Sequence, residues 1–282
     1  MSHALSSVSS NGSSVYFRPR GFVGVRGPAA ADYLNRMISN DVVALAVNES
    51  CEALLLTPKA RVIAPLVVYR RAEDDFLVMT EPDLASVVAA NLLKTRFAAK
   101  AEIEPESHDS YVLFGAEDRP QLPDAIVIGN TEFGAGYEIV GAPAPPELPV
   151  VSEGAAERRR IETGTPLFGR EIDDRVMPAE AGLVDRMVDF EKGCYPGQEP
   201  IARLHYRGHT NRSLRVLRIE AQEAPVFDSE IVHDGRVVGR VTSAVLRESD
   251  VVALGYVRNE VAADALIKVN EARTSIIEPE RP

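Results

Sequence analysis

The residues best suited to chemistry lie in one short segment, residues 192–203, which reads KGCYPGQEPIAR. Gly193 and Gly197 permit a tight turn or positive φ and a close approach to a ligand, and this would present Cys194 on a loop. A thiolate is the reactive form of cysteine, and the nearby ammonium of Lys192 would favour that form. The pattern predicts a reactive Cys194; the alternative is that Cys194 is a small buried hydrophobic residue.

Polar groups are dense around this cysteine. Gln198 and Glu199 would supply hydrogen-bonding groups beside the thiol, and Pro196 would stiffen the turn before them. Buried polar groups need partners, so this density of polar groups and glycines is hard to explain as core packing. We therefore interpret the segment as a functional loop.

Composition and charge bound the class of protein. The chain has 282 residues, of which 45% are hydrophobic and 26% charged, and this is typical of a folded protein of about two domains. Its apolar runs are too short to span a membrane, and its two cysteines predict the cytoplasm rather than a disulfide framework. The net charge of −11 opposes direct, stable nucleic-acid binding, although it leaves room for a local basic patch.

Two helices are expected in the first hundred residues, after a Ser-rich stretch at residues 1–14 that we predict to be a disordered tail. Pro28 suits the first position of a helix that would run to about Ser39. A second, amphipathic helix is expected over residues 82–98. The apolar residues of its buried face would be Leu84, Val87, Val88, Leu92 and Phe97.

Runs rich in Val, Ile and Leu predict strands around these helices. They lie at residues 53–56, 62–69, 76–80, 111–115, 125–129 and 137–141. Pro65 lies inside the second run and argues for an edge strand or a bulge, because proline cannot donate to a ladder. Since helices and strands do not alternate strictly, we expect an α+β fold.

A Pro-rich linker at residues 141–150 separates two parts of the chain. Beyond it, Ser152 would cap a helix that ends at Gly164. Three consecutive arginines of that helix are expected to face water: Arg158, Arg159 and Arg160. Short alternating strands, two of them joined by the hairpin signal Asp234-Gly235, predict a small β-barrel domain over residues 209–282.

The run Lys-Gly-Cys-aromatic-X-Gly-Gln-Glu, which residues 192–199 reproduce without a gap, resembles the hallmark of the YgfZ family. The similarity continues through RIETGTPLFGREI and MPAEAGL before this motif and RGHTNRSL and GRVVGRVTSAV after it. Such proteins are similar to the glycine-cleavage T-protein, GcvT, in which domains surround a central tetrahydrofolate pocket. The resemblance implies a GcvT-like arrangement in which residues 15–208 form the folate-binding α+β region and the barrel follows.

The resemblance also implies which residues serve the site. The MPAEAGL match assigns the folate-binding carboxylate to Glu180, since one carboxylate can accept both donors of a pterin edge; without the resemblance Glu180 reads equally as a helix-start or surface acid. Arg212 in RGHTNRSL would meet the acidic tail of folate or pair on the surface. We assign catalysis to Cys194 and Lys192. The remaining predicted contacts with the cofactor are Gly193, Tyr195, Gly197, Gln198 and Glu199.

One departure from the aminomethyltransferase pattern bears on the reaction. Those enzymes carry paired aspartates before the corresponding hydrophobic strand, one of them catalytic, whereas the matching positions here are Ala64 and Pro65. Folate binding rests on other residues and can survive this change. The sequence therefore predicts that the fold is kept and that aminomethyl transfer is lost.

No metal site is expected in this chain. His205 and His209 have metal-like spacing, but Gly208 lies between them in an expected loop, which favours solvated or locally hydrogen-bonded histidines. Cys51 and Cys194 cannot supply the four ligands of a usual iron–sulfur cluster, so such a role would involve a partner or be transient.

The resemblance favours a folate-dependent accessory role. It implies a protein that binds tetrahydrofolate or a one-carbon-substituted folate and supports the assembly or repair of iron–sulfur enzymes. Its partners would be those enzymes or assembly proteins, and an effect on tRNA modification would be indirect. One alternative is an aminomethyltransferase or another one-carbon transferase. A second is a passive folate-binding module in which Cys194 has no chemistry.

Overall fold

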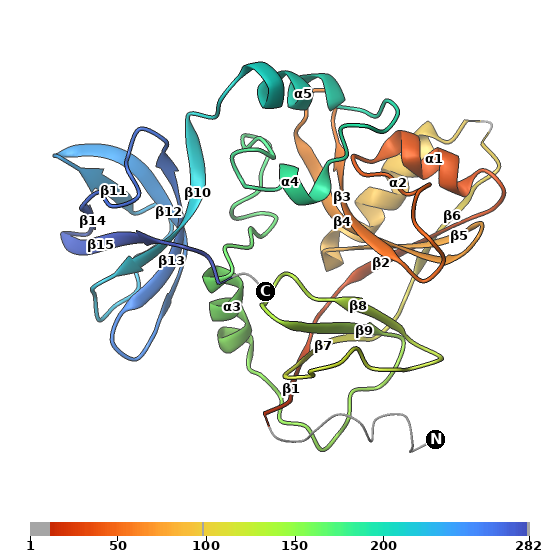
Figure 1. Ribbon diagram of the computed structural model, residues 1–282, viewed down its shortest axis with the longest axis horizontal. Helices are drawn as coiled ribbons and strands as arrows, with labels where there is room; N and C mark the ends of the chain where they lie inside the picture. The colour runs from red at the N-terminus through yellow and green to blue at the C-terminus, as the bar shows by residue number, and fades with distance from the viewer. Residues whose placement is uncertain (1–11, 98, 281–282) are drawn as a thin grey trace.

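Three β-structures and five helices form the part of the chain that the computed structural model describes, residues 12–97 and 99–280 (Figure 1). The first sheet has the strand order β3-β4-β5-β2-β6, the second has the order β1-β7-β9-β8, and the third structure is a closed barrel. The α+β prediction and the C-terminal barrel are both confirmed. No described helix has the length and apolar content needed to cross a membrane.

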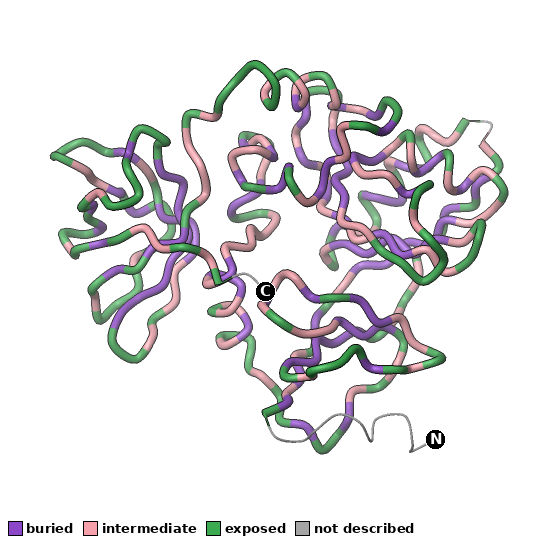
Figure 2. Tube along the Cα trace, in the orientation of Figure 1, coloured by how far each residue is buried: buried purple, intermediate pink, exposed green. Residues whose placement is uncertain are grey.

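The first sheet carries the helices of the N-terminal part on one face. Its strands are β2 (Gly21–Arg26), β3 (Ser50–Leu56), β4 (Val62–Ala72), β5 (Asp75–Thr80) and β6 (Glu102–Glu106). Helix α1 spans Ala30–Met37, and helix α2 spans Ala85–Thr95 after a short 3₁₀ turn at Pro82–Leu84. Apolar residues of both helices and of the sheet form one continuous core (Figure 2).

Both helices differ in detail from the prediction. Helix α1 begins two residues after Pro28, which therefore precedes the helix. In the second helix Leu84, Val88 and Leu92 are buried as expected, whereas Val87 is 39% exposed and Phe97, beyond the helix end, is 90% exposed. Position 98 of the predicted helix lies outside the described residues. The helix stops after Thr95, so the predicted apolar face is shorter than the sequence suggested.

Pro65 lies in β4, between β3 and β5, so the edge-strand interpretation is wrong. The carbonyl of Pro65 accepts a hydrogen bond from Thr80 Oγ1 at 2.8 Å, and regular pairing of β4 with β5 begins only at Val67. A shift in the β3–β4 register lies next to it, between Leu55 and Leu56. The missing N–H is thus tolerated beside a bulge, where the ladder with β5 has not begun.

The second sheet joins distant parts of the chain. Its strands are β1 (Ser14–Phe17), β7 (Ser110–Phe114), β8 (Ile126–Gly129) and β9 (Gly136–Val140). Because Ser14 begins β1, the last residue of the predicted tail is in a strand; positions 1–11 of that tail lie outside the described residues. Only residues 18–20 separate β1 from β2, so this short connector passes directly from the second sheet to the first.

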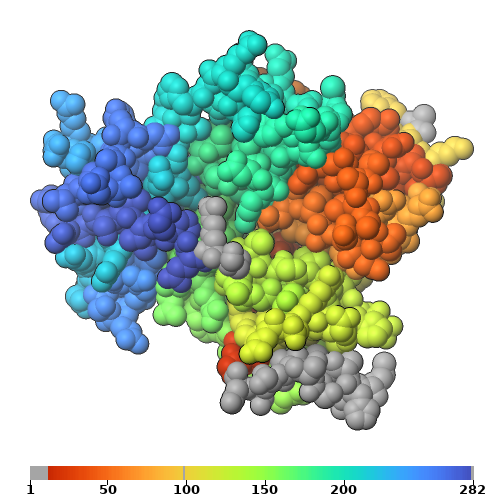
Figure 3. All heavy atoms as spheres, viewed as in Figure 1, coloured from red at the N-terminus to blue at the C-terminus, as the bar shows by residue number. Residues whose placement is uncertain are grey.

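Three helices connect the sheets with the barrel. They are α3 (Glu153–Glu162), α4 (Val184–Met187) and α5 (Gln198–Arg207). The Ser152 hydroxyl accepts a hydrogen bond from the Ala155 N–H, so the predicted cap is confirmed, and Gly164 follows the helix with φ of 72°. In the space-filling view of Figure 3, the C-terminal part of the chain lies on the left, the N-terminal part lies on the right, and the chain between them packs against both.

The barrel closes in the order β10-β13-β12-β11-β14-β15. Its strands are β10 (Arg212–Ile219), β11 (Glu230–His233), β12 (Arg236–Leu246), β13 (Val251–Arg258), β14 (Ile267–Val269) and β15 (Ala272–Ile277). Asp234 and Gly235 both have positive φ and join β11 to β12, as the hairpin signal predicted.

Arg160 is buried, contrary to the expectation that it faces water. Its guanidinium contacts Glu157 at 2.7 Å, the fully buried Glu171 at 3.1 Å and the hydroxyl of Ser243 in the barrel at 2.9 Å. Arg158 on the same helix is 45% exposed, as predicted. A burial pattern of this kind depends on a distant strand that supplies partners, which helical periodicity does not reveal.

We predict that Arg160→Ala lowers the free energy of unfolding by about 3 to 5 kcal/mol, because it leaves a buried carboxylate without its charged partner. Arg158→Ala is the control on the same helix, and its loss should stay within about 0.5 kcal/mol. Urea denaturation followed by circular dichroism measures both. A loss below about 1 kcal/mol for Arg160→Ala would contradict the importance of this contact between α3 and the barrel.

Candidate functional site

A cavity of about 530 Å³ lies where the two sheets meet helices α3 and α4. Its walls come from the β1–β2 connector, strands β3 and β4, the β8–β9 connection, and the chain from 165 to 187. Cavities of ~300 to 1,000 Å³ between domains are typical binding sites for small molecules. Its size and position make this cavity the candidate site for a ligand.

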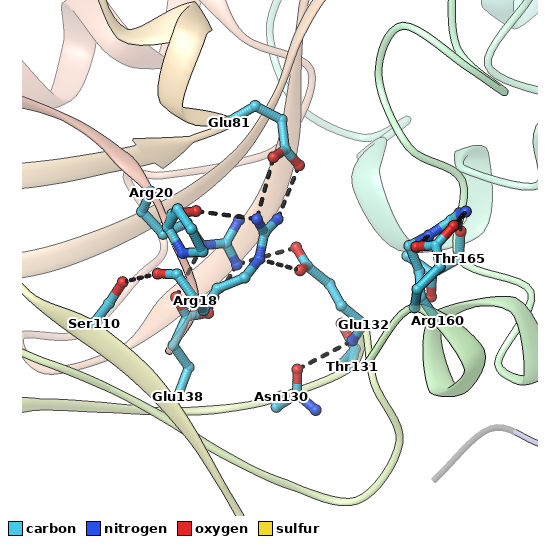
Figure 4. Close-up of polar contacts among 12 residues, drawn as sticks. Arg18, Arg20, Glu81, Ser110, Asn130, Thr131, Glu132, Glu138, Arg160 and Thr165 are labelled. Atoms are coloured by element: carbon cyan, nitrogen blue, oxygen red, sulfur yellow. Dashed lines mark hydrogen bonds and ion pairs between the residues drawn. The ribbon is translucent and has the colours of Figure 1, made fainter. Parts of the chain in front are cut away.

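A network of buried charges forms one wall of the cavity (Figure 4). Arg18 donates to both oxygens of Glu81, at 2.9 and 3.2 Å, and to Glu132 at 3.0 Å. Arg20 bridges the other oxygen of Glu132, at 3.0 Å, to Glu138, at 2.7 Å. Two arginines thus satisfy three carboxylates drawn from both sheets.

The network keeps its central carboxylate ionised. Burial by itself would raise the pKa of Glu132, but the charges of Arg18 and Arg20 outweigh it and lower this pKa to about 2. Paired charges of this kind are rigid because each oxygen and each guanidinium edge already has a partner. The network therefore acts as a fixed wall and offers a ligand few free hydrogen-bonding groups.

Apolar side chains form another part of the lining. They are Val67, Leu167, Ile172, Leu183 and Met187. Arg170 and Arg186 also line the cavity, and both keep partly exposed side chains, at 52% and 30%. An apolar surface with cations at its edge suits a ligand that has a flat ring and an anionic tail.

The conspicuous cysteine motif lies outside this cavity: the described lining includes none of residues 192–199. Cys194 is exposed, on the loop before α5, so the interpretation as a buried hydrophobic residue is wrong. Gly197 has φ of 85°, and a Cβ there would approach the Thr57 carbonyl to 2.7 Å, so this glycine is required. Gly193 has no such constraint.

The Lys192 side chain points into the protein, and the hydrogen bonds of its ammonium are made outside the Cys194 loop. Its ammonium donates to the carbonyls of Asn35, Ile38 and Asn40, at 2.6 to 2.9 Å. Burial lowers the pKa of this amine to about 8. The charge of this amine interacts with that of Cys51. These contacts therefore do not support the predicted activation of Cys194 by Lys192.

The remaining motif residues position the loop and helix. Tyr195 is buried, its ring lies 5.5 Å from the Lys192 ammonium, and within the described chain its hydroxyl has no hydrogen-bond partner. Gln198 and Glu199 form the first turn of α5, where Glu199 is exposed. The structure thus brings these residues together around Cys194, at a distance from the cavity lining.

Glu180 and Arg212 contact one another. Glu180 Oε1 accepts from Arg212 Nε at 3.0 Å and Oε2 accepts from the Met177 N–H at 3.0 Å, while the Arg212 guanidinium lies 4.8 Å from the Tyr256 ring. Neither residue belongs to the described lining of the cavity. For Arg212, the pairing that was open at the sequence level is therefore made with Glu180.

The two positions that depart from the aminomethyltransferase pattern point to different places. Ala64 is fully buried in the core of the first sheet, whereas Pro65 lines the cavity. A carboxylate at position 65 would face the cavity, and proline offers none.

The two histidines lie at the end of helix α5. His205 is in the helix and stacks on Phe190 with 4.2 Å between ring centres, and His209 follows the helix. Both are exposed. In the described ranges, no group of three or more His, Cys, Asp or Glu side chains could hold a metal ion.

Sequence reasoning missed the residues that line the cavity. Arg18, Glu52, Glu81 and Glu132 come from four separate segments, and none lies in a recognisable motif. A weak signal was present in the pair Arg18 and Arg20, because two charges beside apolar strands need acidic partners. Which acids supply them depends on how the sheets pack.

Known proteins resemble this chain in sequence and in fold. No family model matches the chain. A tRNA-modifying protein YgfZ from Edwardsiella ictaluri is 25% identical over 292 residues, which cover 90% of this chain and 87% of that protein. An aminomethyltransferase from Saccharopolyspora erythraea is 25% identical over 269 residues, which cover 79% of this chain and 72% of that enzyme.

The fold is that of an aminomethyltransferase. The crystal structure of the glycine cleavage system aminomethyltransferase T from Bartonella henselae matches with a TM-score of 0.83 and 18% identity, over 95% of this chain and 86% of that one. The chain thus shares the GcvT fold and is similar in sequence to proteins named YgfZ and to aminomethyltransferases. The GcvT-like arrangement expected from the motifs is confirmed.

We predict that a thiol reagent near neutral pH modifies Cys194 at least about ten times faster than Cys51. Cys194 is exposed, whereas burial, reinforced by Asp41 and Glu52 and opposed by Lys192, raises the pKa of the Cys51 thiol to about 12. Mass spectrometry of time points measures both rates. In a Cys194→Ala variant the remaining labelling should be slow and should rise with pH, and fast labelling of Cys51 would contradict this assignment.

Proposed function

We propose that this protein is a cytoplasmic, folate-binding accessory protein that supports the assembly or repair of iron–sulfur enzymes. The observation that carries the proposal is the cavity within a GcvT-like fold, which is lined by Pro65, one of the two positions that the resemblance matches to the paired aspartates of the transferases. The similar proteins named as tRNA-modifying support a link to tRNA modification, which we propose acts indirectly through client enzymes.

The residues of the cavity fit a reduced folate. Apolar side chains such as Leu183 and Met187 would pack against the pterin ring, and Arg170 would attract the carboxylates of the glutamate tail. A bound reduced folate would supply one-carbon chemistry. The protein residues would hold and orient it and exclude water from its ring.

The assignment of Glu180 to the pterin, and of Arg212 to the tail, remains a prediction from the resemblance. Glu180 could take that role only if its carboxylate exchanged Arg212 and the Met177 N–H for the pterin donors. The same holds for the predicted folate contacts of the Cys194 loop. We also retain, as a proposal, the division into a folate-binding region at 15–208, with its linker at 141–150, and a barrel domain at 209–282.

Cys194 is the group that we propose acts on client proteins. Its exposed position on a loop held by the buried Lys192 and Gly197 would let a partner approach the thiol. Since the chain has two cysteines, a four-ligand cluster would need ligands from that partner. Folate and thiol would thus occupy separate places on one framework.

The fold itself favours a second candidate, a one-carbon transferase, and the two candidates differ in a measurable reaction. We predict that the protein binds tetrahydrofolate in calorimetry but does not transfer methylene from aminomethyl-lipoyl protein. Pro65 cannot orient or deprotonate the attacking amine, and acid–base assistance is typically worth ~10² to 10⁴ in rate. Turnover at the rate of a genuine T-protein, assayed in parallel, would favour the transferase.

The role of the thiol is tested in cells that lack the protein. We predict that Cys194→Ala folds and binds folate but fails to restore iron–sulfur enzyme activity, whereas Cys51→Ala restores it. Full restoration by Cys194→Ala would favour the passive folate-binding module.

A further inference from the structure

A pterin ring needs a carboxylate that is free to accept hydrogen bonds, because it presents adjacent ring N–H and exocyclic amine donors. Three carboxylates of the cavity wall are already occupied by arginine, and a fourth, Glu153, is exposed at the start of α3. Both oxygens of Glu81 accept from Arg18, Glu132 is shared by Arg18 and Arg20, and both oxygens of Glu157 accept from Arg160. A ligand would have to displace a buried ion pair to use any of them.

Glu52 differs from these three carboxylates. It lines the cavity with a side chain that is 20% exposed. One oxygen accepts a hydrogen bond from the Thr131 hydroxyl at 3.0 Å, and the other lies 3.4 Å from Arg186 Nε, beyond the usual hydrogen-bond range of ~2.7 to 3.2 Å. Glu52 is therefore held in place while keeping free capacity to accept hydrogen bonds.

The register of the first sheet places Glu52 near Pro65. Glu52 of β3 lies opposite Val67 of β4, and Leu54 lies opposite Pro65. Directly opposed residues project from the same face of a sheet, and so do residues two apart on one strand. Glu52 and Pro65 are thus diagonal neighbours, at a Cβ separation of roughly 7 to 8 Å or less. A glutamate side chain can extend from there toward the space in front of Pro65.

We propose that Glu52 is the carboxylate that binds the donor edge of the pterin in this protein, from the face of the first sheet that Pro65 also occupies. The proposal rests on the folate binding proposed above and names the residue that recognises the ring. Thr131 and Arg186 are its positioning residues, because they fix the carboxylate from the second sheet and from helix α4.

The test is calorimetric titration of the full chain with 5-formyltetrahydrofolate and with p-aminobenzoylglutamate, which carries the tail without the pterin. We expect Glu52→Gln to weaken binding of the folate by at least about 30-fold and to leave the tail fragment unchanged. Simple electrostatics predicts the opposite sign, since removing a negative charge near an anionic ligand should strengthen its binding. A loss confined to the folate therefore reports recognition of the ring.

Two variants serve as controls. Glu104→Gln removes the same charge from an exposed site on β6 and should bind folate like the parent protein. Glu180→Gln tests the carboxylate that the resemblance assigns to the pterin. Thermal denaturation confirms that each variant is folded.

The outcomes separate the two proposals. If the parent protein binds neither ligand, the folate-binding function fails. If the parent binds folate and Glu52→Gln binds it equally well, or if Glu52→Gln weakens folate and tail fragment alike, the role of Glu52 is overturned. A loss in Glu180→Gln with none in Glu52→Gln would assign the pterin to Glu180.

Discussion

The ion network of Arg18 and Arg20 is the interaction on which the rest of the structure depends. Both arginines lie on the connector between β1 and β2, which belong to different sheets. Through Glu81 at the end of β5 and through Glu132 and Glu138 around β9, they tie the two sheets together and form a wall of the cavity. Buried charges are tolerated only with partners, so this network fixes how the sheets meet.

A consequence of this arrangement is that the chemical groups fall into two places. The cavity is assembled from distant segments whose charges largely satisfy one another, whereas the cysteine motif forms a local, exposed loop before α5. Lys192 connects the loop to the core, because its ammonium donates to carbonyls in the last turn of helix α1 and just after it. The framework can therefore hold a ligand inside and present a thiol outside without either one disturbing the other.

Kinship with the aminomethyltransferases is visible in the fold and altered in the cavity. Pro65 of β4 lines the cavity, while the neighbouring strand β3 carries Glu52 on the same face. One framework can support different chemistry, because function is set by the side chains that line the site rather than by the architecture.

The sequence by itself determined the features that depend on near neighbours. The Ser152 cap, the Asp234-Gly235 hairpin, the strands and the positive φ of Gly197 follow from local sterics and hydrogen bonding, and the motifs identified the family. Tertiary structure alone decided the burial of Arg160, the inward turn of Lys192 and the pairing of Glu180 with Arg212. Each of these depends on a partner far along the chain: Ser243 for Arg160, the Ile38 carbonyl for Lys192. A charged side chain is buried only where such a partner offsets the free-energy cost of its desolvation, and the periodicity of the sequence does not reveal distant partners.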